Sequence, residues 1–467
     1  MNDIGLIGLG VMGKSLVLNI EDKGYYISCY NYTPKETKDL METAAKGKNI
    51  SAFYDLESFV NSLKKPRKIF LMITAGNPVD SMIKKLIPFL DMGDIIMDGG
   101  NSYFQDTTRR INNLNERGIC YLGIGVSGGE SGALNGPSLM PGGSKEAYDL
   151  VKDILLKIAA NTEAGPCCTY IGNGSAGHFV KMIHNGIEYG MMQAISEAYD
   201  VMRKSLRLST EEIGDIFEDW NSGELNSFLM EISYKIMRHK DDETAKTLVD
   251  LILDKAGQNG TGKWTAQTSL DLGIPAPSLI VAVEERVISF FKEKRTSISE
   301  KVVKRYPEVS YDKKKIVEEL KNSLLFSNFI LFSQGLWLIS EASNLYKYDI
   351  NLLKVLKIWK GGCIIRSKSL NFFMEIIDED NKNINLLDSQ KSLDFLMGKL
   401  DSIKDVTIIA RNSYVPTMVH NTALDYFYSM VEENLPTNLI QAQRDFFGAH
   451  TYGRSDKEGI FHTKEWI

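Results

Sequence analysis

The sequence predicts an α/β domain, a large all-helical domain and a C-terminal tail without regular structure, in that order. Strand and helix signals alternate over residues 1 to about 170, which indicates a parallel sheet covered by helices. After Gly177 strand signals nearly vanish, and helical periods continue to Glu433. The remaining residues contain Gly448, Gly453 and Gly459 and look irregular. We therefore expect domains at 1–176, 177–433 and 434–467.

Five apolar, β-rich runs mark the strands of the first domain. They are IGLIG at 4–8, YYISCY at 25–30, KIFLMI at 68–73, DIIMD at 94–98 and CYLGIG at 120–125. Each run is followed by turn residues and then by a helical period, as in repeated strand–helix–strand units.

The helical half repeats short sequences in the same order. ISEA occurs at 195–198 and 339–342, and the pattern W-x-x-G occurs at 220–223 and 359–362. Two matches at similar offsets predict an internal duplication of a helical unit within this domain.

Composition and charge narrow the classes of function. The chain has 467 residues, of which 43% are hydrophobic, and a net charge of −6. Without a long basic run, we expect neither a nucleic-acid partner nor a membrane-surface role. The most apolar segment, 324–339, also contains polar residues such as Asn328 and Gln334, so we expect a buried helix rather than a membrane span.

Cysteine usage favours a reducing compartment. The five cysteines form no CxxC pair, and an odd count fits neither a disulfide scaffold nor a zinc cluster. The N-terminus shows no signal-peptide pattern. We therefore expect a cytoplasmic protein without a metal site.

Glycines at the first predicted turn indicate a nucleotide site. Gly8, Gly10 and Gly13 have the spacing GxGxxG and stand between an apolar strand and a helical run. The first glycine permits a tight turn, the second lets the backbone approach a pyrophosphate, and the third lets helix and strand pack closely. This context predicts a Rossmann-like, dinucleotide-binding domain.

The end of the second predicted strand does not decide between NAD and NADP. An acid there binds the ribose hydroxyl of NAD, and a basic group accepts the extra phosphate of NADP. This chain has Asn31, Tyr32 and Thr33 there, followed by Lys35 and Lys38.

A second glycine-rich segment, GVSGGESGALNGPSLMPGG, spans residues 125–143. Dense glycine costs folding entropy, so we expect this backbone to approach another group closely. Upstream, DGGNS at 98–102 ends a strand at the edge of the sheet where ligands bind in open α/β folds.

One helical segment, GHFVKMIHNGIEYG at 177–190, collects polar side chains on one face. Lys181, His184, Asn185 and Glu188 recur at spacings of three, four and seven residues. Seven residues span two helical turns, so Lys181 and Glu188 lie about 10 Å apart along the axis. The residues alone leave open whether this face is a solvated stripe or lines a site.

The chain resembles the decarboxylating 6-phosphogluconate dehydrogenases. The segments that carry the resemblance are GLGVMG, DGGNS, GVSGGESGALNGPSLMPGG, GHFVKMIHNGIEYG, AGQNGTGKWT, WKGGCIIR and LIQAQRDFFGAHTYGR, in this order along the whole chain. The resemblance implies a pentose phosphate pathway oxidoreductase that uses NAD or NADP. It also implies a homodimer in which each C-terminal tail reaches the partner subunit.

The resemblance assigns the reaction and its residues. It implies oxidation of 6-phosphogluconate at C3 and loss of its C1 as CO2. The resulting enediol is then protonated at the carbon that lost CO2, which is C1 of the product. Lys181 corresponds to the general base, which requires a lowered pKa, and Glu188 to the general acid. The implied substrate ligands are Asn101, Ser127, Gly128, Gly129, His184, Asn185, Tyr189, Thr261, Arg286, Arg444 and His450, the last two from the tail of the partner subunit. The implied coenzyme contacts are Gly8, Leu9, Gly10, Val11, Met12, Gly13, Asn31, Tyr32, Thr33, Ile73, Thr74, Ala75 and Asn101.

The chain departs from the family pattern at four positions. NADP is the family default, but Tyr32 stands where the family has arginine and Glu36 aligns with a lysine. We therefore predict a weakened preference for NADP that admits NAD. Asn259 replaces a lysine that touches the substrate phosphate, a loss of about 1.5–3 kcal/mol at most. Thr74 stands where many members have lysine, with no defined consequence.

Two other functions remain to be distinguished. One is a β-hydroxyacid dehydrogenase for a smaller, unphosphorylated substrate, although such enzymes are usually shorter and have one helical unit. The other is a non-catalytic, dinucleotide-binding scaffold. The joint presence of Lys181, Glu188, Ser127 and Asn101 argues against this second function.

Overall fold

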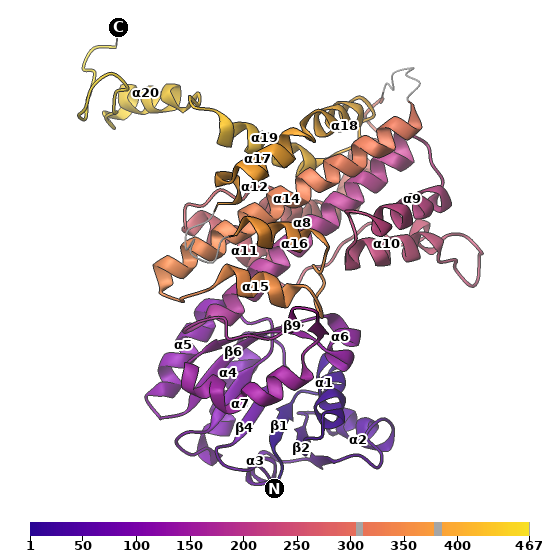
Figure 1. The fold of residues 1–467 in the computed structure, drawn as a ribbon, viewed down its shortest axis with the longest axis vertical. Coiled ribbons are helices and arrows are strands. Elements are labelled where there is room, and N and C mark those ends of the chain that lie inside the picture. Colours follow the sequence, from indigo (N-terminus) through magenta and orange to yellow (C-terminus); the bar gives the residue numbers. More distant parts are fainter. Residues whose placement is uncertain (305–311, 378–384, 467) are drawn as a thin grey trace.

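The structure, a computed structural model, describes residues 1–304, 312–377 and 385–466. An α/β domain at one end joins a larger body of packed helices, and the C-terminal segment projects away from that body (Figure 1). The predicted α/β domain followed by a large helical domain is confirmed.

The sheet of the first domain has seven strands in the order β3-β2-β1-β4-β5-β6-β7. The strands are β1 (Ile4–Ile7), β2 (Ile27–Tyr30), β3 (Ile50–Phe53), β4 (Lys68–Leu71), β5 (Ile95–Asp98), β6 (Cys120–Ser127) and β7 (Ser138–Gly143). Strands β1 to β6 are parallel, and β7 runs antiparallel to β6. The order reverses between β1 and β4, and such a switch point opens a crevice at the carboxyl ends of the strands.

Five of these strands were predicted from the sequence, and β3 and β7 were not. Strand β7 has the sequence SLMPGG, which lacks a β-rich pattern. It is a strand because it pairs with β6 from Ser127–Ser138 to Leu122–Gly143. The glycine-rich segment 125–143 is therefore regular structure: the end of β6, helix α6 (Gly129–Asn135) and β7.

Helices cover both faces of the sheet and bury two apolar clusters against it. One cluster contains Leu16 and Leu155, from α1 (Val11–Asp22) and α7 (Lys145–Ile158). The other contains Val79 and Leu114, from α4 (Asn77–Leu86) and α5 (Phe104–Asn115). The remaining elements up to residue 166 are α2 (Pro34–Glu42), α3 (Leu56–Asn61), the 3-10 turn η1 (Ile87–Phe89) and a hairpin of β8 (Asn161–Thr162) and β9 (Gly165–Pro166).

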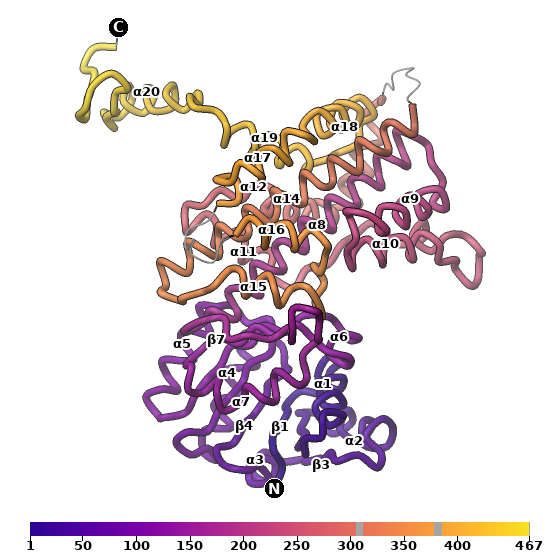
Figure 2. The backbone as a smooth tube through the Cα atoms, viewed as in Figure 1, coloured from indigo at the N-terminus to yellow at the C-terminus, as the bar shows by residue number. Residues whose placement is uncertain are grey.

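Two long helices, α8 (Ala176–Lys204) and α14 (Lys313–Tyr346), pack along each other at the centre of the second domain (Figure 2). The other elements are α9 (Thr210–Ser222), α10 (Phe228–Arg238), η2 (Leu248–Asp250), α11 (Thr261–Asp271), α12 (Pro277–Phe290), α13 (Lys292–Ser299), α15 (Leu352–Trp359), α16 (Ser369–Ile376), η3 (Leu386–Asp388), α17 (Gln390–Met397), α18 (Leu400–Asn412) and α19 (Met418–Val431). The ISEA segments lie on α8 and α14, and the W-x-x-G segments end the helices that follow, α9 and α15. The repeated sequences thus occupy equivalent places in two helix pairs, α8 with α9 and α14 with α15.

Helix α14 is the one described helix that is long and apolar enough to cross a membrane, and 94% of its most apolar window is buried inside the protein. Its apolar side chains include Phe326, Phe329 and Phe332, each at most 1% exposed. This burial is that of a core helix, as expected from the polar residues in the same segment.

The tail is more regular than the sequence predicted, because residues 437–448 form helix α20 (Thr437–Gly448). Ala449 ends this helix in a left-handed conformation. The chain then folds back on α20, and the fully buried Asp445 carboxylate accepts bonds from the backbone N–H groups of Thr451 and Thr463. The prediction of an irregular tail holds only after α20.

Candidate active site

The first turns of α8 lie directly on strands β6 and β7, at one edge of the sheet. A Cβ atom at Gly177 would overlap the carbonyl oxygens of Gly123 and Met140. Likewise, a Cβ atom at Gly125 would lie 2.5 Å from Cβ of Lys181. The group that the glycine-rich strands approach is therefore helix α8, and this contact buries Lys181.

The Lys181 side chain is 5% exposed, and its Nζ atom donates a hydrogen bond to Oδ1 of Asn185 at 2.7 Å. Burial lowers the pKa of Lys181 from its ordinary value of 10.5, while the charges of Glu188 and Cys363 act in the opposite direction. A lysine with a depressed pKa can become a neutral amine, which is the form that accepts a proton.

Asn185 connects three neighbouring groups. Its Oδ1 accepts bonds from Lys181 and, at 3.1 Å, from Nδ1 of His184, while its Nδ2 donates to Oγ1 of Thr261 at 3.0 Å. Because an amide oxygen only accepts, Nδ1 of His184 carries a proton, and Nε2 accepts from the Ser127 hydroxyl at 3.3 Å. The predicted ligands Ser127, His184, Asn185 and Thr261 thus form one network around Lys181.

His184 is fully buried against Trp359, with ring centroids 5.6 Å apart in an edge-to-face arrangement. Burial, and secondly the charge of Lys181, hold the pKa of His184 well below its usual range. Its approach of 3.8 Å to a carboxylate oxygen of Glu188 is therefore a polar contact of a neutral imidazole.

Glu188 completes the helix face two turns from Lys181. Its side chain is 19% exposed. Burial raises the pKa of Glu188 above 4.5, against the lowering effects of Lys181 and Arg286. A carboxyl group with a raised pKa retains its proton to higher pH and can act as a general acid.

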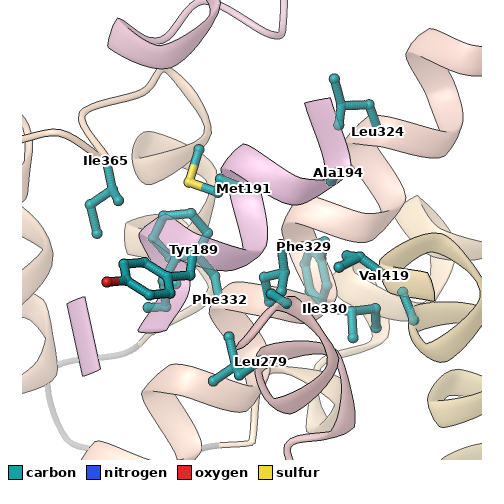
Figure 3. Packing of buried hydrophobic residues seen from close by; sticks show 14 of the residues in the cluster. Tyr189, Met191, Ala194, Leu279, Leu324, Phe329, Ile330, Phe332, Ile365 and Val419 are labelled. Carbon is teal, nitrogen blue, oxygen red and sulfur yellow. The ribbon is translucent and has the colours of Figure 1, made fainter. Parts of the chain in front are cut away.

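Arg286 covers the ring of Tyr189, with its guanidinium carbon 3.5 Å from the ring centroid. Figure 3 shows the Tyr189 oxygen pointing away from Phe329 and Ile330 of the apolar core. Arg286 also donates to the carbonyl oxygen of Gly257 at 2.9 Å, just before α11. Helix α11 begins at Thr261, 3% exposed, with no acidic residue in its first turn. A guanidinium and a helix N-terminus that lie close together suit an anion.

The loop between β6 and α6 carries the other predicted ligands. Ser127 is 2% exposed at the end of β6. Gly128 has φ +121, and a Cβ atom there would lie 2.6 Å from the carbonyl oxygen of Gly362. Gly129 starts α6 and has open space around it. Asn101 is exposed in the loop after β5, where Gly100 packs against the backbone of Ile73.

The first glycine loop fits a dinucleotide pyrophosphate. Gly8 has φ +103, and Cβ atoms at Gly8 and Gly13 would overlap the carbonyl oxygens of Met72 and Gly8, respectively. Gly10 has no atom within 4 Å of an added Cβ. Helix α1 begins at the next residue, with neither a side-chain cap nor an acidic residue in its first turn, which leaves its first N–H groups without a side-chain acceptor.

The other predicted coenzyme residues surround the same switch point. Leu9, Val11 and Met12 belong to the glycine loop and the start of α1, and Ile73, Thr74 and Ala75 follow β4. The backbone N–H of Leu9 donates to Oδ1 of Asn31 at 2.9 Å, which connects the loop to the end of β2.

A buried network next to Asn101, centred on Asp98, was not predicted from the sequence. The Asp98 carboxylate, fully buried, accepts bonds from the Ser102 and Tyr121 hydroxyls at 2.6 and 2.7 Å and lies 3.5 Å from Arg110. His178 adds a bond from Nε2 to the Asp98 carbonyl oxygen at 3.0 Å. The sequence feature that could have indicated this network is His178, a histidine three residues before Lys181 on the apolar side of the helix.

Arg444 and His450 are not brought to this face of α8 within one chain. Both are exposed, and Arg444 lies on α20, which projects from the body (Figure 1). In the described part of the chain, no group of three or more His, Cys, Asp or Glu residues is placed to hold a metal ion.

Two family models cover nearly the whole chain. Residues 3–172 match the NAD binding domain of 6-phosphogluconate dehydrogenase, and residues 177–466 match the C-terminal domain of 6-phosphogluconate dehydrogenase. Among curated relatives, two Bacillus subtilis proteins cover 99% of this chain and 99% of their own length. They are the NADP-dependent decarboxylating 6-phosphogluconate dehydrogenase, at 48% identity, and the NAD-dependent one, at 46% identity.

A solved structure shares the complete fold. The chain aligns with Plasmodium falciparum 6-phosphogluconate dehydrogenase, which was solved in its apo form, with its cofactor NADP+ and with its substrate 6-phosphogluconate. The TM-score is 0.95 and the identity 43%, over 99% of this chain and 100% of that chain. By family models, curated relatives and fold alike, this chain belongs to the 6-phosphogluconate dehydrogenase family.

Proposed function

We propose that the protein converts 6-phosphogluconate into ribulose 5-phosphate and CO2, with reduction of NAD or NADP. The observation that carries this proposal is the face of α8, where a lysine with a lowered pKa and a glutamate with a raised pKa stand two turns apart. The matched relatives and the solved P. falciparum structure carry names for this activity or this substrate.

Lys181 accepts the proton of the C3 hydroxyl in the first step. The bound nicotinamide supplies the acceptor for the hydride that leaves C3. The hydrogen bond to Asn185 restrains the amine, and burial favours its neutral form, in which a lone pair is available for the proton. The product of this step is a 3-keto acid.

Glu188 provides the proton that completes the reaction. The new 3-keto group draws the electrons of the C1–C2 bond as CO2 leaves, and the ammonium of Lys181 returns its proton to the C3 oxygen, which gives an enediol. The carboxyl group of Glu188 then protonates this enediol at the carbon that lost CO2, while the hydroxyl proton passes back to the neutral amine of Lys181 and the ketone forms. Separation of base and acid by two helical turns, about 10 Å along the axis, suits a six-carbon substrate lying along α8.

The remaining groups hold the substrate. Ser127, His184 and Asn185 bond its hydroxyls and carboxylate, together with Asn101, Gly128 and Gly129. Arg286, Tyr189 and Thr261 hold the terminal phosphate at the start of α11. The guanidinium of Arg286 is suited to this by its fork of donors, and Asn259, exposed at the same place, adds no charge.

The division into residues 1–176, 177–433 and 434–467 follows this assignment, with the coenzyme on the first part and the substrate mainly on the second. The third part reaches a second copy of the chain in a homodimer and supplies Arg444 and His450 to its phosphate site. The projecting α20, with exposed Phe446 and Phe447, supports this exchange.

The protein acts in the cytoplasm, with neither nucleic acid nor a membrane as a partner. Its five cysteines are free thiols, four of them buried, as expected for a reducing compartment.

A direct assay tests the proposal. Purified protein is mixed with 6-phosphogluconate and either NAD or NADP, and both the reduced nicotinamide and the released CO2 are measured. Equal amounts of the two products are expected. Reduction without CO2, or activity only with a short unphosphorylated hydroxy acid, would point to a β-hydroxyacid dehydrogenase, and no turnover with any acid to a non-catalytic scaffold.

A further inference from the structure

A carboxylate stands at the end of β2, in the part of the coenzyme crevice that faces an adenosine ribose. Oε2 of Glu36, in the first turn of α2, accepts a bond from Nδ2 of Asn31 at 3.1 Å and another from the Thr33 hydroxyl. Nδ2 of Asn31 also donates to Thr33 Oγ1 at 3.0 Å. Two donors from neighbouring residues thus hold the Glu36 side chain over the strand end.

The same asparagine connects this carboxylate to the pyrophosphate loop. Oδ1 of Asn31 accepts from the backbone N–H of Leu9, between Gly8 and Gly10. The orientation of Glu36 is therefore fixed relative to the loop that fits the pyrophosphate. In dinucleotide-binding folds, an acid placed about 20 residues after the glycines accepts a hydrogen bond from the ribose 2′-hydroxyl.

Charge at this position supports the same assignment. Hydrogen bonds, first the one from Thr33, lower the pKa of Glu36 below its ordinary value, so the group is an anion at neutral pH. A carboxylate offers about four acceptor positions, so capacity remains for a ribose hydroxyl. A 2′-phosphate at this place would instead meet a fixed negative charge.

The cations near this site are lysines: Lys14, whose charge helps to lower the pKa of Glu36, and Lys85. The ring of Tyr32, the residue after Asn31, is 74% exposed. Lys85 of α4 lies over this ring, with Nζ 5.0 Å from its centroid. Tyr32 thus presents an aromatic surface and one hydroxyl, which suits an adenine ring better than a phosphate.

From this geometry we propose that Glu36, held by Asn31 and Thr33, accepts the 2′-hydroxyl of the adenosine ribose and makes the protein select NAD over NADP. This inference rests on the proposed function only for the identity of the reaction. The contact itself is a property of the first domain and can be measured without turnover.

The experiment compares two ligand fragments and two coenzymes on the full-length protein. Calorimetry measures the binding of 5′-ADP, which carries a free 2′-hydroxyl, and of 2′,5′-ADP, which carries a 2′-phosphate. Steady-state kinetics with 6-phosphogluconate then give kcat/KM for NAD and NADP. The variants are Glu36→Gln, Glu36→Lys and, as a matched control, Glu42→Gln, which removes an exposed carboxylate from the other end of α2.

The wild type is expected to bind 5′-ADP more tightly than 2′,5′-ADP and to prefer NAD. Glu36→Gln should lower the ratio of NAD to NADP kcat/KM by about 10- to 100-fold, the range of a charge-assisted hydrogen bond. Glu36→Lys should lower it further, and Glu42→Gln should leave it unchanged. Tighter binding of 2′,5′-ADP by the wild type would overturn the inference, as would equal effects of Glu36→Gln and Glu42→Gln.

Absence of 6-phosphogluconate oxidation with both coenzymes would contradict the proposed function and leave the calorimetry to decide the role of Glu36. Conversely, robust oxidation with a preference for NADP would sustain the proposed function and overturn this inference.

Discussion

Oδ1 of Asn185 lies 2.7 Å from Nζ of Lys181, one turn earlier on α8, and also accepts a bond from His184. An amide oxygen accepts from an amine as well as from an ammonium, so this contact orients the lysine in both protonation states. It therefore does not fix a positive charge as a carboxylate would. The pair is suited to a lysine that gains and loses a proton during turnover.

Replacing the lysine should remove the first proton transfer. For Lys181→Met we expect kcat to fall by about 10²- to 10⁴-fold, the usual contribution of a general base. The control is Lys204→Met in the last turn of the same helix, where the lysine pairs with Asp200 at the surface. Release of CO2 by Lys181→Met at the wild-type rate would show that another group accepts the proton.

The dependence of kcat on pH should have two limbs. Lys181 must be neutral, so activity falls as pH decreases through its lowered pKa, and Glu188 must be protonated, so activity falls as pH rises through its raised pKa. Because the two groups interact, the apparent values belong to the pair. Glu188→Gln should lose the fall in activity at high pH and retain the fall in activity at low pH. A profile of unchanged shape in this variant would exclude Glu188 as the acid.

Stability should also depend on the charge of Lys181. Its folded-state pKa lies below 10.5, so the unfolded chain binds more protons than the folded one in the pH range below that value. The wild type therefore gains stability as pH rises through this range, and Lys181→Met lacks this gain. We expect the unfolding temperature of the variant, relative to wild type, to be highest near neutral pH and to decrease toward pH 10.5. A difference that does not vary with pH would contradict a depressed pKa.

Two glycines of the first loop should respond differently to alanine. Gly10 has φ −67 and ψ −175 and open space at its Cβ position, so Gly10→Ala should keep or raise stability, by about 0.4–1 kcal/mol. Its methyl group would occupy the place of the pyrophosphate and weaken coenzyme binding by at least about tenfold. Gly13→Ala would overlap the Gly8 carbonyl oxygen and should destabilise the fold by about 1–3 kcal/mol. Thermal unfolding and coenzyme titration separate the effects; a destabilised Gly10→Ala would refute this division of roles.

Exchange of the tail can be tested by mixing two inactive variants. A hybrid dimer of Lys181→Met and Arg444→Ala chains contains one site with an intact lysine and an arginine from the other chain. After co-expression, random pairing should restore about one quarter of the wild-type activity per chain. Tails that served their own chains would restore none. The control is co-expression of Lys181→Met with Lys181→Met, which should remain inactive.

Local patterns were sufficient for much of the fold. The spacing of Gly8, Gly10 and Gly13 alone specifies a tight turn. Whether a Cβ atom fits at Gly8 or Gly13 depends on groups close by, the backbone of Met72 just after β4 and that of Gly8 itself. The helical spacing of Lys181 and Glu188 likewise places them on one face whatever packs against it. Strand β7 was missed because its pairing with β6, rather than its own composition, makes it a strand.

The sequence by itself determined the order of the domains, the nucleotide loop and the composition of the α8 face. The tertiary structure decided what surrounds that face: Thr261 and Ser127 join it from 76 and 57 residues away along the chain. It also decided the direction of each pKa shift, because desolvation depends on atoms brought together only by folding. Gly125 illustrates the contribution of the sequence and that of the tertiary structure. The sequence shows that this residue is a glycine, but its contact with Lys181 exists only when α8 lies on the sheet.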